Sequence, residues 1–99
     1  MGITYYMDYV NHCLRFYVTH TDATDFISDV DKANWTACKD AFSVFDEHQR
    51  QLLRELYSRR VPMGEAVKEI SADNNISADY LWKILKSLQK DVAKRRGLL

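Results

Sequence analysis

The sequence predicts an all-α protein of about five helices, and three observations indicate this class. Apolar residues recur at three- and four-residue spacing in every long segment, which is the period of an amphipathic helix. No stretch alternates between apolar and polar residues, as a half-buried strand does. The chain has 99 residues, a length that supplies one small core, so a single domain is expected.

Two helices are expected in the N-terminal part, residues 1–45. The first runs from Thr4 to about Val18, and the second runs from Ser28 or Asp29 to Val44. The polar residues 19–25 connect them and are rich in turn-forming and capping side chains. Two neighbouring sides of the second helix are apolar, one traced by Val30, Ala33, Ala37, Ala41 and Val44, the other by Trp35, Cys38 and Phe42.

Three further helices are expected in residues 46–99. The first covers residues 47–59, and Asp46 with Gln49 is spaced as a capping box before it. Residues 61–64, Val-Pro-Met-Gly, are a turn, because proline cannot continue the preceding helix. The next helix covers residues 64–73, and the last covers residues 78–96 and ends before Gly97, a C-terminal stop signal.

The segment between the last two helices has the chemistry of a tight turn. Asn75 tolerates a left-handed backbone better than most non-glycine residues. Ser77 is suited to cap the last helix, and Asp79 lies in its first turn, where the helix dipole favours an anion. One side of this helix is an apolar stripe of Leu81, Ile84, Leu85, Leu88 and Val92. The opposite side is basic and carries Lys83, Lys86, Lys90 and Lys94. Two helices joined by a short turn, the second amphipathic and basic, are typical of a helix-turn-helix DNA-binding unit.

The charge distribution favours an anionic partner for the C-terminal half. The formal net charge is zero, but residues 1–48 carry −5 and residues 49–99 carry +5. The lysines of the last helix have a simpler interpretation, since a solvated helix face is often lysine-rich. No apolar run approaches the roughly 18 residues of a membrane span. The N-terminus lacks the basic flank and cleavage site of a signal peptide, so we expect a cytoplasmic protein with no membrane partner.

No set of residues predicts catalysis, a metal site or a cofactor. His12, His20 and His48 share no metal-ligand spacing with each other or with the cysteines. Asp22, Asp25, Asp29 and Asp31 are spaced roughly like calcium ligands, but the glycine and the terminal glutamate of a calcium loop are missing. No glycine-rich phosphate loop and no nucleophile elbow occurs. We therefore do not expect an enzyme.

Cys13 and Cys38 both fall within helical patterns. Free, buried thiols are expected for them, because cytosolic disulfides are rare, and a disulfide between them is the alternative.

Glu69 and Ile70 near the end of one helix are followed by Ile76, Ser77 and Leu81 around the start of the next. In this pattern the C-terminal half resembles region four of bacterial sigma factors. In that family an Arg- and Leu-rich helix leads into a Glu-Ile-Ala-x-x-x-Gly-Ile-Ser segment and a recognition helix with an apolar residue four places after the serine. The matching residues are Glu69, Ile70, Ile76, Ser77 and Leu81. The departures are Ser71 for alanine, Asn74 for an apolar residue and Asn75 for glycine. The resemblance covers residues 45–97, and the whole chain is similar to small sigma-like proteins of phages and conjugative elements of Gram-positive bacteria.

This resemblance implies binding to double-stranded DNA and regulation of transcription, with RNA polymerase as a candidate partner. The last helix is then expected to enter the major groove with its N-terminal side chains nearest the bases. The candidate base contacts are Ser77, Ala78, Tyr80 and Lys83, and the candidate phosphate contacts are Arg59, Arg60, Lys86 and Lys90. Beside Leu81, Trp82 is expected to pack under the helix of residues 47–59, with an exposed position as the alternative, and Tyr80 is expected to be the more exposed of the two aromatic rings.

Six aromatic residues precede residue 27. They are expected to form the core and its edge, although aromatic residues also concentrate at interfaces. A homodimer is a hypothesis on this ground, since helix-turn-helix proteins often pair on two half-sites. The competing function is a helical protein–protein interaction module that does not bind DNA.

Overall fold

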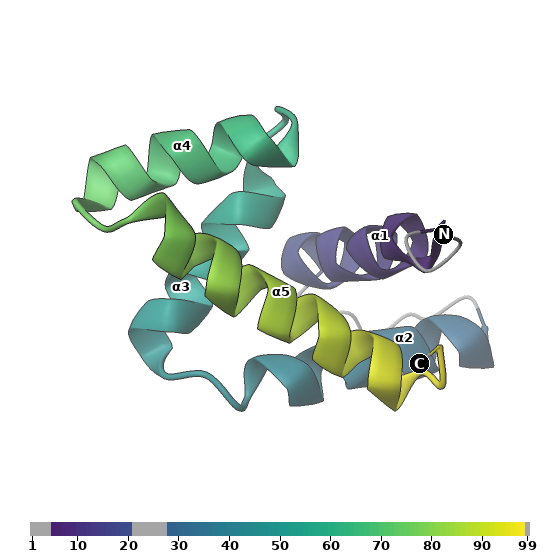
Figure 1. Cartoon of the computed structure of the whole chain (residues 1–99). Coiled ribbons are helices and arrows are strands. Elements are labelled where there is room, and N and C mark those ends of the chain that lie inside the picture. Colours follow the sequence, from purple (N-terminus) through teal and green to yellow (C-terminus); the bar gives the residue numbers. More distant parts are fainter. Residues whose placement is uncertain (1–4, 21–27, 99) are drawn as a thin grey trace.

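The computed structural model describes residues 5–20 and 28–98, which form five α-helices (Figure 1). These are α1 (Tyr5–Thr19), α2 (Asp29–Phe42), α3 (Glu47–Ser58), α4 (Met63–Asn74) and α5 (Ala78–Arg95). No strand occurs within the described ranges, so the predicted all-α class and the predicted number of helices are confirmed. Thr4, Asp22, Asp25 and Phe26 lie outside the described residues.

Side-chain caps begin α2 and α3. The Ser28 hydroxyl accepts a hydrogen bond from the Asp31 amide at 3.2 Å. At α3, the Asp46 carboxylate accepts from the Gln49 amide at 2.8 Å, and the Gln49 side chain accepts from the Asp46 amide at 3.1 Å. The predicted capping box is therefore present. Each such cap stabilises its helix by about 0.5–2 kcal/mol relative to alanine.

The turn between α4 and α5 has the predicted left-handed residue and the predicted cap. Asn75 has φ 54° and ψ 44°, and the amide that follows it, on Ile76, donates to the Ser71 carbonyl at 3.0 Å. This closes the end of α4 in the manner of a Schellman motif. Two residues later the Ser77 hydroxyl accepts from the Tyr80 amide at 3.0 Å and starts α5.

Two residues that depart from the sigma pattern find hydrogen-bond partners within α4. Ser71 is buried and its hydroxyl donates to the Val67 carbonyl. Asn74 is exposed, and its side-chain amide donates to the Ile70 carbonyl at 2.8 Å. Neither polar side chain therefore enters the core unpaired, which would be costly.

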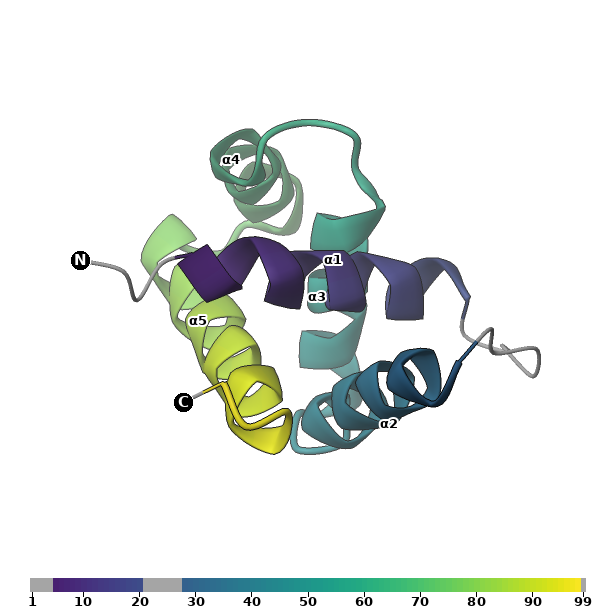
Figure 2. The same ribbon diagram turned by 90° about the vertical axis from the view of Figure 1, so that its right-hand side faces the viewer.

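Helix α5 packs against all four other helices (Figures 1 and 2). Its N-terminal part lies beside α4 and its C-terminal part reaches α2 (Figure 1). Its buried residues are Leu81, Ile84, Leu85, Leu88, Gln89, Val92 and Ala93. One hydrophobic cluster contains residues of all five helices, so α1 and α2 complete the same core that α3, α4 and α5 build.

A largely buried polar triad, Asn11, Tyr57 and Gln89, joins α1, α3 and α5. The Tyr57 hydroxyl donates to Oδ1 of Asn11 at 2.7 Å, and Nε2 of Gln89 donates to the same oxygen at 2.9 Å. Tyr57 and Gln89 are 1% and 6% exposed, so these bonds satisfy groups that water cannot reach. Removing one partner from such a set leaves the others short of a bond, and the triad therefore favours one register among the three helices.

The buried side of α2 lies between the two apolar sides that the sequence suggested. It consists of Asn34, Ala37, Cys38, Ala41 and Phe42. Val30 and Val44 are 54% and 67% exposed, so the side they help to trace is only partly buried. Asn34 is the first member of the buried stripe, and the apolar pattern could not identify it because the residue is polar. Its amide donates to the Tyr9 hydroxyl at 2.8 Å.

We predict that, because the backbone at Asn75 is left-handed, alanine at this position destabilises the protein more than glycine does. Asn75→Ala should lower the free energy of unfolding by about 1 kcal/mol, because Cβ disfavours this conformation and alanine lacks the local amide. Asn75→Gly should cost less, since glycine adopts positive φ without strain. Urea unfolding of both variants measures the difference, and equal destabilisation by the two substitutions would contradict the assignment.

The buried thiols predict a loss of stability at alkaline pH. Cys13 and Cys38 are free and buried, and burial raises the pKa of Cys38 to about 12. An unfolded thiol has a pKa of about 8.5, so above this pH the unfolded state binds fewer protons than the folded state. The free energy of unfolding should then fall as the pH rises, by about 1.4 kcal/mol per pH unit for each thiol that stays protonated in the folded state.

Cys38→Ala should make the fall in stability between about pH 9 and 11 shallower, because one of these groups is removed. Tyr57→Phe should act the same way above about pH 10, since burial also raises the pKa of Tyr57. Urea unfolding at stepped pH measures the slopes, which are independent of any constant cost of the substitution. An unchanged slope for Cys38→Ala would show that this thiol does not control the alkaline response.

Candidate nucleic-acid interface

The exposed face of α5 carries a row of four lysines. Lys83, Lys86, Lys90 and Lys94 are all exposed and follow one another at intervals of three and four residues. At about 100° per residue, they lie on one face, opposite the buried stripe. The predicted basic face is therefore present as a continuous solvent-exposed surface along the helix.

The first turn of α5 is exposed but connected to α3. Ser77, Ala78 and Tyr80 are exposed, and the Tyr80 side chain leans toward the start of α3, where its hydroxyl accepts a hydrogen bond from Nε2 of Gln49 at 3.1 Å. The same Gln49 closes the capping box of α3. The position of the first turn of α5 is thus coupled to the start of α3, while the Tyr80 hydroxyl proton can still donate to another group.

Trp82 is only partly buried at the edge of the core, so the predicted burial is incomplete. Its ring lies 6.0 Å from Nζ of Lys86. A cation over an indole face is attracted by the ring quadrupole. Lys86 is therefore partly oriented by Trp82, whereas Lys83 makes no ion pair with any described residue. Tyr80 is 38% exposed, so it is the more exposed of the two aromatic rings, as predicted.

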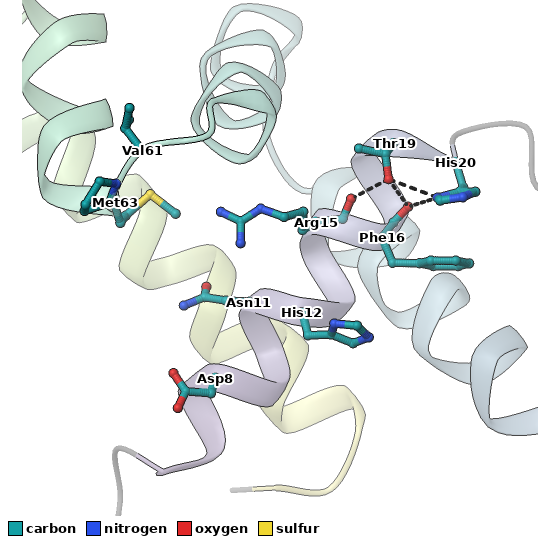
Figure 3. A pocket seen from close by; sticks show the side chains of 10 residues that line it. Asp8, Asn11, His12, Arg15, Phe16, Thr19, His20, Val61 and Met63 are labelled. Atoms are coloured by element: carbon teal, nitrogen blue, oxygen red, sulfur yellow. Dashed lines mark hydrogen bonds between the residues drawn. The ribbon is translucent and has the colours of Figure 1, made fainter.

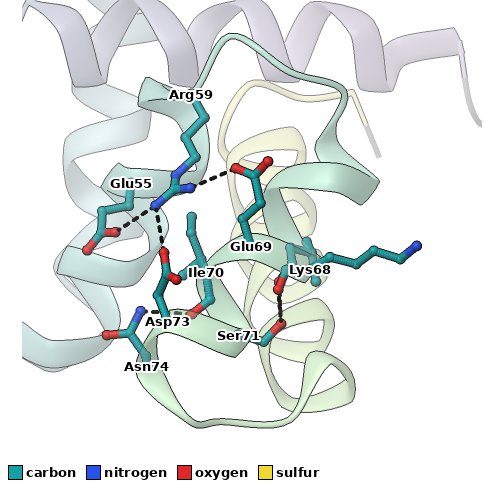
Figure 4. A network of polar contacts seen from close by, with 9 residues as sticks. Glu55, Arg59, Lys68, Glu69, Ile70, Ser71, Asp73 and Asn74 are labelled. Atoms are coloured by element: carbon teal, nitrogen blue, oxygen red, sulfur yellow. Dashed lines mark hydrogen bonds and ion pairs between the residues drawn. The ribbon is translucent and has the colours of Figure 1, made fainter.

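Arg59, at the end of α3, is surrounded by three carboxylates (Figure 4). Its guanidinium lies 2.7 Å from Glu69, 3.5 Å from Asp73 and 3.6 Å from Glu55. The hydrogen bond to Glu69 is the main cause that raises the pKa of Arg59. These contacts join α3 to the outer side of α4, so the charge of Arg59 is already balanced within the protein.

The candidate residues are divided between two places in the fold. Ser77, Ala78, Tyr80, Lys83, Lys86 and Lys90 share α5 or its N-cap. Arg59 and Arg60 begin the connection from α3 to α4. Figure 2 shows that the start of this connection lies across the molecule from α5. Arg60 is exposed, but this placement separates it from the lysine row.

Two of these interactions had no signal in the sequence. Gln49 and Tyr80 are 31 residues apart, and Asp73 lies 14 residues from Arg59; only packing brings them together. Glu55 is different, because it lies four residues before Arg59, where a helical ion pair is expected from sequence alone.

The described residues contain no group of three or more His, Cys, Asp or Glu side chains placed to hold a metal ion. None of the described helices combines the length and the apolar character needed to cross a membrane. No protein-family profile matches the chain, and comparisons with curated proteins and with solved structures also find no match.

We predict that Arg59 stabilises the protein in a salt-dependent manner. Arg59→Gln removes the cation between Glu55, Glu69 and Asp73 and leaves these carboxylates to repel one another. The thermal midpoint should fall at low salt, and the difference from the unsubstituted protein should shrink as salt screens the charges. Arg60→Gln is the matched control, since Arg60 makes no ion pair within the described part of the chain. Equal effects of the two substitutions would exclude a specific role for this network.

Proposed function

We propose that the protein binds double-stranded DNA as a helix-turn-helix protein similar to sigma region four, and regulates transcription. The observation that supports this proposal best is the exposed lysine row of α5, which follows a tight turn and a serine cap. A basic helix of this kind suits the major groove, and its lysines replace counterions on the phosphates. The sigma-like residues Glu69, Ile70, Ile76, Ser77 and Leu81 lie in or next to the same turn.

The dimensions of α5 agree with this proposal. Its 18 residues span about 27 Å at 1.5 Å per residue, which exceeds the roughly 12 Å width of the major groove. The N-terminal turns of α5 would therefore enter the groove while its later turns continue past one strand. In this docking α4 crosses the backbone, as the first helix of such units does.

The side chains of α5 divide into two roles under this proposal. Ser77, Ala78, Tyr80 and Lys83 would meet base edges, because they lie in the first turns. Lys86 and Lys90 lie about one and two turns beyond Lys83 and would contact phosphates, which position a protein without specifying sequence. We assign Arg59 a supporting role, since its ion pairs hold α4, the helix that leads into the turn.

The competing function, an interaction module without DNA binding, depends on exposed aromatic residues in the N-terminal half. Tyr17 is 6% exposed, and its ring packs 5.4 Å from that of Trp35 and 5.2 Å from that of Phe42. Tyr9 is 39% exposed and accepts a hydrogen bond from Asn34. These described aromatic residues serve the core and its edge, which favours DNA binding by α5 as the first hypothesis. A homodimer and a contact with RNA polymerase remain hypotheses beside it.

We predict that Lys83 and Lys86 differ in what they contribute to DNA affinity. Lys86→Ala should weaken binding to all sequences alike and reduce the slope of log affinity against log salt by about one unit, as one lost phosphate contact does. Lys83→Ala should weaken binding to the preferred site more than to random DNA. The difference should be about 1–3 kcal/mol if Lys83 forms a bidentate pair with guanine.

Fluorescence anisotropy with a random-sequence duplex, and with a site selected from a random pool, measures both effects over roughly 50–200 mM salt. Lys39→Ala is the matched control, because Lys39 is an exposed lysine on α2. If Lys83→Ala and Lys86→Ala change DNA affinity no more than Lys39→Ala does, the lysine row is only a solvated surface. The interaction-module hypothesis would then replace DNA binding.

A further inference from the structure

A groove runs between α1 and the connection from α3 to α4 (Figure 3). It continues into a second hollow at the end of α3, because both are lined by Arg15, Thr19 and Val61. The buried stripe of α5 packs against the other helices, α1 among them, and the lysine row lies on the opposite, exposed face of α5. The groove is therefore a surface separate from the lysine row.

Two arginines give the groove and the hollow that continues it a positive charge: Arg15 lines both, and Arg60 lines the second hollow. Arg15 and Arg60 are exposed, and neither forms an ion pair with a carboxylate of the described chain. Arg59 also lines the second hollow, but its charge is balanced by Glu55, Glu69 and Asp73. The carboxylate that lines the groove is Asp8, near the start of α1 and away from the Arg15 guanidinium (Figure 3).

The Arg15 side chain is held in place before any ligand binds. Its Nε donates to the Tyr57 carbonyl at 3.4 Å, and its guanidinium lies 5.9 Å from the centre of the Tyr57 ring. The bond engages Nε alone, so the terminal N–H groups can still pair with an anion. A guanidinium fork that is already oriented loses less side-chain entropy when it binds a carboxylate.

The wall beside the arginines is apolar. Val61 and Met63 are partly buried, Pro62 is exposed, and all three line the groove. These side chains come from the end of the connection between α3 and α4 and from the first residue of α4. Val61 and Met63 lie on the side of α1 toward which Arg15 extends, whereas the Phe16 ring points the other way and stacks on His20 (Figure 3). A free anion would use the arginines but gain nothing from this wall. A peptide with both acidic and apolar side chains would use both features.

We propose that this groove binds an acidic segment of a partner protein. Carboxylates of the segment pair with Arg15 and Arg60, and one of its apolar side chains packs against Val61 and Met63. The charge complementarity decides the kind of partner, since Arg15 and Arg60 have no acidic partner in the described chain and line hollows that share the apolar Val61. Arg–carboxylate pairs can be bidentate, which adds geometric specificity to the contact. A duplex bound to α5 would leave this groove open, so both partners can be held at once.

The test uses the full chain and a fluorescein-labelled peptide of four Glu-Glu-Leu repeats. Arg15→Gln should weaken binding of this peptide by about fivefold or more, the loss expected for a charge-assisted hydrogen bond. It should leave DNA affinity within about twofold of the original value, because Arg15 lies off α5. Lys68→Gln is the control for non-specific charge, since Lys68 is exposed on α4 and points away from Arg59 (Figure 4).

Amide shifts in a nuclear magnetic resonance titration should appear at α1 and at residues 58–63. Equal weakening by Arg15→Gln and Lys68→Gln, shifts confined to α5, or displacement of the peptide by duplex DNA would each overturn the proposal. So would the absence of measurable peptide binding. If Arg15→Gln disturbs folding, Arg60→Gln takes its place, with the same loss of peptide affinity expected.

Discussion

The structure depends on the burial of one stripe of α5 against the four other helices. Leu81, Leu85 and Leu88 are fully buried, and each such side chain contributes about 1.5–3 kcal/mol of hydrophobic stabilisation. Because α5 touches every other helix, its rotation about its own axis is set from several sides. The Asn11, Tyr57 and Gln89 triad adds a polar constraint to the same packing. The lysine face is turned to solvent as the direct consequence.

The orientation of α5 is further set at its N-terminal end. Arg59 holds α4 to α3, and Gln49 joins the start of α3 to Tyr80 in the first turn of α5. The surface proposed to meet DNA is thus supported by side chains that need not touch DNA themselves. The groove beside Arg15 uses different elements, α1 and the connection from α3 to α4. The fold therefore presents two charged surfaces whose proposed ligands do not compete for space.

Some features escaped the sequence pattern for identifiable reasons. The buried side of α2 includes the polar Asn34, so a pattern built only from apolar residues gave two sides that flank the buried stripe. Arg59 and Arg60 are adjacent and chemically alike, yet one is balanced by three carboxylates and the other by none in the described chain. Glu69 and Asp73, two of these three partners, lie on α4, and only the crossing of α3 with α4 brings them close. Trp82 lies at the edge of the core, a position that helical spacing alone does not resolve.

By itself, the sequence determined the local structure of this protein. The all-α class, the five helices, the Asp46 and Ser77 caps and the left-handed Asn75 all follow from interactions within a few residues along the chain, which spacing and residue type encode. The lysine row of α5 was predictable for the same reason, since one helical period places its members together. Only the tertiary structure decided which arginines are balanced, how Gln49 and Tyr80 meet, and that Arg15 shares a groove with Arg60. These are contacts between elements far apart in sequence, and they exist only once the helices have packed around α5.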